Sequence, residues 1–348
     1  MSIRLVLVAL CACLAVLLAP AASTRAQTPP PAKPVTAYGW PVRPFNKPHP
    51  VRANFGDPRT VFVDPFLGGG IDGPGSFSFH NGVDISAPGG TPVYAVRSGI
   101  AHIISGSMVV VSAADDSWKF QYDHLDPVVF ETQAVVARKT VLGTVQPSAG
   151  HVHLSELEGT NVVNPAQKGH LTPYIDHTKP TVARIDVRSP TGESVGPIAI
   201  CGHVSVVASV YDRPQLPIPG TFAGLPVAPA WVAWKVTKLD GRVVVPLTVR
   251  VDFRKLLPIV SDFWNVYARG TYQNAPRFGR QQFGGMPGRF LYILDPSLDT
   301  RMLGNGVSVV TVIAKDIRGN AAALTQRVSV LNTTTPAGCP ATAVPPKH

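Results

Sequence analysis

Short runs of apolar or alternating residues, separated by Gly, Pro, Asn and Asp, recur along most of this chain. Runs of this length, with breaks of this kind, are typical of β-strands. The 35 Pro and 31 Gly among 348 residues favour turns over long helices. The sequence therefore predicts an all-β protein. The first runs are "TPVYAV", "GIAHII", "SMVVVSA", "WKFQYDHL", "TVLGTV" and "HVHLSE".

The runs fall into two sets, which predicts two folded domains. The first set indicates an antiparallel β-sheet domain over residues 40–170. The second, over residues 180–335, contains about seven short strands and favours an immunoglobulin-like β-sandwich. Within it, "KLDGRVVV" predicts a hairpin at Asp240-Gly241, and "AKDIRGNAAALTQRVSV" predicts another. Residues 63–82 and 262–289 lack a regular period, so we expect two long loops, the second packed on the sandwich.

The first residues of the chain predict an exported protein. Residues 1–26 have the layout of a secretory signal peptide, one Arg, an apolar run and then small residues. The apolar run is short for a membrane span, so we expect cleavage and no transmembrane anchor. Residues 27–39 read as a Pro-rich linker and 336–348 as a tail. Cleavage would leave Cys201 and Cys339, and an oxidising compartment permits a disulfide between them.

The balance of charge is basic, with 31 Lys and Arg against 21 Asp and Glu and a net charge of +10. In an exported protein this favours an anionic surface or polymer as partner, although a solvated basic surface without a partner explains the charge equally well. No run of Lys and Arg interleaved with aromatic residues occurs. We therefore expect no nucleic-acid partner.

Two histidines lie two residues apart in "GHVHLSE". A lone His-x-His pair is weak evidence, but residues i and i+2 of a strand face the same side, so His151 and His153 would present both rings together. The chain also holds a single His-x3-Asp, His80 and Asp84. Asn81-Gly82 between them disfavours a helix, so we expect a turn that leads into a strand and brings imidazole and carboxylate together.

These residue types are ligands that zinc prefers, and a catalytic zinc site has three protein ligands and a water. His80, Asp84 and either His151 or His153 would complete such a set. His124, in "FQYDHLDP" on another expected strand, would then be one of two histidines left beside the metal-bound water for proton transfer and oxyanion stabilisation. No HExxH occurs, so the carboxylate base of that class of metalloprotease is absent.

In content, order and spacing, "WPV", "VRANFGDPR", "HNGVDISAPGGTPVYAVRSGIA", "YDHL" and "GHVHL" resemble the M23 peptidases, the lysostaphin- and LytM-like zinc endopeptidases of bacterial cell walls. The resemblance covers roughly residues 40–165. It implies a small antiparallel β-fold with a groove over the sheet. It also implies that zinc binds to His80, Asp84 and His153, with His151 and His124 as the catalytic pair.

Two of the departures from the family pattern bear on the site, and a third is the plainer sequence "PSAGHVH" where many members have a Gly-rich approach. Leu154 and Ser155 stand where Phe and Glu are common. Neither is an expected ligand, so this departure affects the packing and the groups around the ligands. Residues 61–79 hold no Tyr, although some members place one shortly before the first zinc histidine. Oxyanion stabilisation would then depend more on zinc and the two histidines.

Two classes of function remain open. The first is a secreted, periplasmic or wall-associated bacterial zinc endopeptidase that cleaves peptide bonds of peptidoglycan, or in a narrower variant a Gly-rich protein. The second is a non-catalytic M23-like module that binds the wall or regulates other hydrolases. Retention of every zinc residue favours the enzyme.

Overall fold

The computed structural model describes residues 37–63 and 73–332. Almost every regular element in these ranges is a strand. The prediction of an all-β protein is therefore confirmed. The short helical elements are η3 (Gly220–Phe222), η4 (Val260–Asp262), α1 (Phe263–Val266) and α2 (Thr300–Leu303). None of the helices in the described ranges has the length and apolar character needed to cross a membrane.

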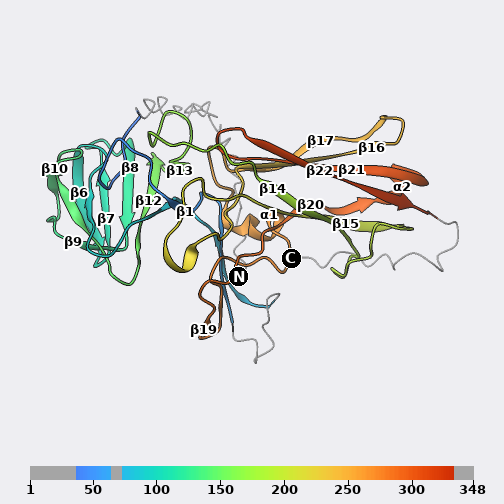
Figure 1. Cartoon of the computed structure of the whole chain (residues 1–348), viewed down its shortest axis with the longest axis horizontal. Helices are drawn as coiled ribbons and strands as arrows, with labels where there is room; N and C mark the ends of the chain where they lie inside the picture. The colour runs from blue at the N-terminus through green and yellow to red at the C-terminus, as the bar shows by residue number, and fades with distance from the viewer. Residues whose placement is uncertain (1–36, 64–72, 333–348) are drawn as a thin grey trace, which may run out of the picture. The chain divides into compact units, whose positions relative to one another are not determined.

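The first set of strands forms an eight-stranded sheet in which all neighbours are antiparallel, in the order β1-β4-β12-β8-β7-β6-β10, with β13 paired to β12. Figure 1 shows β6, β7, β8 and β12 side by side. The strands are β1 (Val51–Ala53), β4 (Val83–Ser86), β6 (Gly99–Ser105), β7 (Met108–Ser112), β8 (Trp118–Asp123), β10 (Gln133–Val135), β12 (His151–Glu158) and β13 (Asn161–Val163).

A smaller antiparallel sheet, β5-β11-β9, shares a core with the large one. Its strands are β5 (Pro92–Tyr94), β9 (Leu125–Pro127) and β11 (Val141–Val145). The alternation in "HVHL" decides which side chains enter this core. Val152 and Leu154 are completely buried in it, so His151 and His153 face the opposite side of β12.

The second set of strands forms two antiparallel sheets, β14-β15-β20 and β17-β16-β21-β22. Side chains from both sheets pack in one core, which makes this part a sandwich of seven strands. Its immunoglobulin-like character stays a prediction, as do the two domain boundaries. The strands are β14 (Thr181–Arg188), β15 (His203–Tyr211), β16 (Trp231–Lys238), β17 (Val243–Asp252), β20 (Leu291–Asp299), β21 (Gly306–Lys315) and β22 (Ala321–Val330).

Both predicted hairpins are confirmed. Strands β16 and β17 pair on either side of Asp240-Gly241, where Lys238 N donates to Arg242 O at 2.8 Å. Strands β21 and β22 pair over ten residues each.

A fifth sheet, β19-β18-β2-β3, shows that both loop predictions were partly wrong. Its strands are β2 (Pro58–Phe62), β3 (Gly75–Phe79), β18 (Arg277–Phe278) and β19 (Gln281–Gln282). The end of the expected loop 63–82 is thus strand β3, because "GSFSF" alternates and pairs with β2. The expected loop 262–289 contains α1, β18 and β19, and β18 pairs in parallel with β2. It packs on the sandwich core through Phe263 and Val266.

Several expectations concern residues that the structure does not describe. The signal peptide, most of the linker and the tail lie outside the described residues. Cys201 is buried and disulfide-bonded, whereas Cys339, its expected partner, lies outside them.

Candidate metal centre

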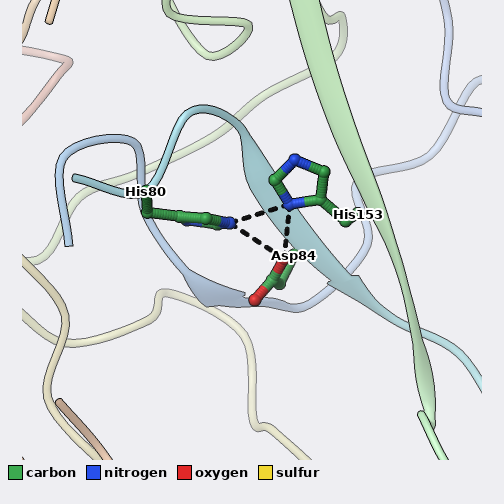
Figure 2. Close-up of side chains that lie close together, drawn as sticks. All are labelled: His80, Asp84 and His153. Atoms are coloured by element: carbon green, nitrogen blue, oxygen red, sulfur yellow. Dashed lines mark hydrogen bonds and ion pairs between the residues drawn. The ribbon is translucent and has the colours of Figure 1, made fainter. Parts of the chain in front are cut away.

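Three of the predicted residues meet at one point. His80 Nε2 and His153 Nδ1 each lie 3.0 Å from Asp84 Oδ1, and the two nitrogens are 2.9 Å apart. Figure 2 shows the three side chains pointing toward one another. All three are buried. His80 follows β3, Asp84 lies on β4, and His153 lies on β12 directly opposite Asp84 in the register.

The backbone around His80 is fixed from both sides. Asn81 and Gly82 connect the end of β3 to the start of β4, and the chain bends at Gly82. The ring of Phe79, immediately before His80, packs in the sandwich core against Phe253, Phe263 and Tyr267 at centroid distances of 5.4 to 5.9 Å. The second half of the chain therefore helps to hold a residue of this centre in place.

The far nitrogen of each histidine has its own partner. His80 Nδ1 donates to the carbonyl oxygen of Asn54 at 2.8 Å, which leaves Nε2 of the neutral ring as an acceptor toward the centre. His153 Nε2 lies 2.7 Å from Ser155 Oγ and can donate to it, which leaves Nδ1 as an acceptor. Partners of this kind orient the histidines of metal sites.

The protonation states of His80 and Asp84 at neutral pH favour binding of a cation. Burial, reinforced by Arg59, lowers the pKa of His80 to about 3. Burial alone would raise the pKa of Asp84, but His80 and Arg59 hold it well below its ordinary value; Arg59 Nη2 donates to Asp84 Oδ2 at 2.9 Å. Neutral imidazole and ionised carboxylate are the forms that bind metals.

The three donors fit zinc. Two imidazole nitrogens and one carboxylate oxygen bind it at about 2.0 to 2.2 Å, and tetrahedral geometry separates such donors by about 3.3 Å. The distances here are a little shorter. The described part of the chain adds no fourth His, Asp, Glu or Cys to the set, and Asp84 lines two open cavities. The arrangement matches a catalytic site, which keeps one position open, and not a closed structural one.

The other two predicted residues, His124 and His151, lie beside this centre. Their ring centroids are 4.4 Å apart, and His151 Nε2 is 3.5 Å from Asp84 Oδ1. Both rings line a cavity of about 250 Å³. Burial lowers the pKa of His124, and lowers that of His151 to about 4. We expected His124 on a strand, and this prediction was wrong. It lies between β8 and β9 with φ of 65°, which turns its ring out of the strand's alternation.

The sequence of this region matches a known family. The pattern of Peptidase family M23 matches residues 78–165. These residues form an M23 peptidase domain. All five residues considered above lie within the matched stretch, so the family prediction from "HNGVDISAPGGTPVYAV" and "GHVHL" is confirmed.

Solved structures of similar proteins include peptidases. A zinc-containing peptidase from Vibrio cholerae is 24% identical, over 37% of this chain and 39% of its own, with a TM-score of 0.28. Csd3 from Helicobacter pylori is 18% identical over 37% of this chain and 34% of its own, with a TM-score of 0.27. The chain thus spans well under half of either protein. The catalytic domain of lysostaphin from Staphylococcus simulans, an antimicrobial peptidase, is 22% identical. The match covers 32% of this chain and 89% of that domain, with a TM-score of 0.23. No protein with a curated description matches.

Sequence reasoning missed three residues around the M23 centre. Ser155 was noted only as a departure from the family, although its position two residues after His153 places it on the same face of β12. Arg52 Nη2 lies 2.7 Å from His151 Nδ1, and Arg59 contacts Asp84. Nothing in "VRANFGDPR" indicates either contact, because Arg52 meets His151 across paired strands of one sheet and Arg59 meets Asp84 between two different sheets.

Proposed function

We propose that this protein is a secreted, zinc-dependent endopeptidase that hydrolyses peptide bonds of bacterial peptidoglycan. The observation that carries the proposal is the convergence of three acceptor atoms, from His80, Asp84 and His153, beside an open cavity. Three lone pairs about 3 Å apart repel one another unless a cation lies between them. Bound there, zinc would polarise the scissile carbonyl and lower the pKa of a water to about 7.

His80, Asp84 and His153 hold the metal in this proposal. Asn54 and Ser155 keep the two imidazoles in the tautomers that present a lone pair. Arg59 binds the second oxygen of Asp84 and keeps this carboxylate ionised and oriented.

His124 and His151 handle the proton and the developing oxyanion. His151 Nδ1 lies 2.7 Å from Arg52 Nη2 and 2.9 Å from the carbonyl oxygen of Ala149. Accepting from Arg52 would place the proton of the neutral ring on Nε2, on the side of Asp84, whereas donating to Ala149 would leave a lone pair there. One of the two histidines would accept the proton of the attacking water, and the other would donate to the oxyanion.

The substrate class follows from the family resemblance and from charge. Peptidoglycan carries many carboxylates, and a net charge of +10 attracts the protein to such a polymer. The expected signal peptide would deliver it to the periplasm or the cell wall.

Metal content and activity test the proposal together. We expect the purified protein to hold one zinc and to release peptides from murein, and we expect His80→Ala and Asp84→Ala to lose both properties. His102→Ala is a matched control, since His102 lies on the surface in an ion pair with Glu131 and should change neither. Full hydrolysis of murein by both metal-centre variants would contradict the proposal. Zinc-free protein that binds murein without cleaving it would indicate a wall-binding or regulatory module.

A further inference from the structure

The cavity beside the metal centre has a second wall made by residues far along the chain. One side is formed by Arg52, Arg59, His124 and His151 of the M23 part. The other side includes Phe222, which ends η3, and Gln273. A substrate bound in a groove flanked in this way would contact both sides.

The second wall is tied to strand β2 by direct hydrogen bonds. Thr60 N donates to Gln273 Oε1 at 2.7 Å, and Gln273 N donates to Thr60 Oγ1 at 3.1 Å. Next to them, Asn274 bonds to Pro226 O and accepts from Gly288 N at 2.6 and 2.7 Å. These contacts fix the wall in place before any ligand arrives, which lowers the cost of binding.

Two guanidinium groups face this cavity. Arg52 stacks on the ring of Phe222 at 4.2 Å and uses both terminal nitrogens on His151 and Ala149. Among the described residues, the side chain of Arg59 makes one hydrogen bond, in which Nη2 donates to Asp84 Oδ2. Its side chain is 31% exposed. Arg59 therefore retains donors for a ligand.

Among the neutral side chains of the lining, Gln273 offers a donor. Gln273 Oε1 accepts from Thr60 N, so Gln273 Nε2 is available to donate to a ligand. The remaining carboxyl group in the lining, Asp57, is 2% exposed, and its Oδ1 accepts from Ala228 N at 2.6 Å. Two arginines face the ionised carboxylate of Asp84, and burial raises the pKa of Asp57 to about 7. At and below neutral pH the lining is therefore positive, and a bound metal would add to this charge.

We propose that this cavity is a subsite for a free carboxylate of the peptide substrate, held by Arg59 and Gln273 next to the scissile bond. The planar fork of Arg matches a carboxylate. Because Asp84 turns one oxygen to Arg59 and the other to the histidines, a carboxylate on Arg59 lies one side chain away from the metal. The inference rests on the proposed function and narrows it to peptides that carry a free carboxylate near the cleaved bond.

Binding without catalysis tests the subsite. The probes are muropeptides and the same muropeptides after their carboxylates have been converted to carboxamides. Affinity for full-length protein is measured by calorimetry in the presence of a chelator, so that no hydrolysis occurs and no carboxylate can bind metal. We expect the acid form to bind about tenfold more tightly, the contribution of one charge-assisted hydrogen bond.

Two variants locate the effect. Gln273→Glu keeps an oxygen for Thr60 N and adds a negative charge to the subsite, so the preference for the acid form should disappear. Gln281→Glu adds the same charge on β19, outside the cavity lining, and should retain the preference. Equal affinity of wild type for both probes, or an unchanged preference in Gln273→Glu, would overturn the subsite. Failure of murein hydrolysis with zinc would instead contradict the proposed function and leave this binding result standing.

Discussion

Replacing Ser155 by alanine removes the hydroxyl that lies against the far nitrogen of His153. Ser155 is completely buried, with Oγ 2.7 Å from His153 Nε2, so the change leaves a buried N–H without its acceptor. Asp123 Oδ2, at 3.9 Å from the same nitrogen, is an alternative acceptor. Partners of metal-bound histidines are worth about 10- to 100-fold in metal affinity, or about 1.4 to 2.8 kcal/mol. We expect Ser155→Ala to weaken zinc binding about 10-fold, and Ser155→Ala with Asp123→Ala to approach 100-fold.

Competition with a chromogenic chelator at pH 7 measures this affinity. Ser86→Ala is a matched control, because Ser86 is buried on neighbouring β4 and its Oγ has no hydrogen-bond partner among the described residues. The affinity of Ser86→Ala for zinc should stay within about twofold of that of the wild type. If both Ser155 variants bind zinc as tightly as Ser86→Ala does, His153 is not oriented through Ser155 and the account of its tautomer is wrong.

Three further changes test the fold around the centre. A Cβ on Gly82 would lie 2.3 Å from a backbone oxygen of β12, so Gly82→Ala should lower both the melting temperature and the zinc content, whereas Gly106→Ala, which meets nothing within 4 Å, should not. Tyr38 Oη donates to completely buried Glu156 at 2.5 Å, so Tyr38→Phe should cost about 1 to 3 kcal/mol in urea unfolding; an unchanged midpoint would contradict this. Burial raises the pKa of Asp212 from 3.8 to about 8. Between these pH values the folded state keeps a proton on Asp212 that the unfolded state has lost, so the free energy of unfolding falls as pH rises from 4 to 8. Asp212→Asn should therefore gain a few kcal/mol over wild type between pH 4 and pH 8, and an equal difference at both pH values in urea unfolding would refute it.

The local pattern of the sequence was sufficient to bring together most of the residues of the candidate metal centre. Alternation along "HVHL" puts His151 and His153 on one face of β12, and the structure places both there, opposite core residues Val152 and Leu154. The bend at Gly82, between β3 and β4, likewise follows from the local sequence Asn81-Gly82. His124 was misplaced because a left-handed residue between two strands leaves no periodic signal when its neighbours "FQYD" and "LDP" both read as strand.

Contacts between distant segments could not be predicted in this way. The pairing of β18 with β2 joins residues more than 200 positions apart, and two-residue strands carry no hydrophobic period to indicate it. The interaction of Gln273 with Thr60 depends on that pairing. The second wall of the cavity was therefore visible only once the tertiary structure brought these segments together.

Mass spectrometry of muropeptides tests the central claim most directly. Purified murein is digested with the full-length protein as isolated, with a chelator, and with zinc restored after the chelator. The proposed function predicts new peptide termini in the first and third samples and none in the second. Cleavage that the chelator leaves unchanged, or no cleavage by protein that holds one zinc, would contradict it.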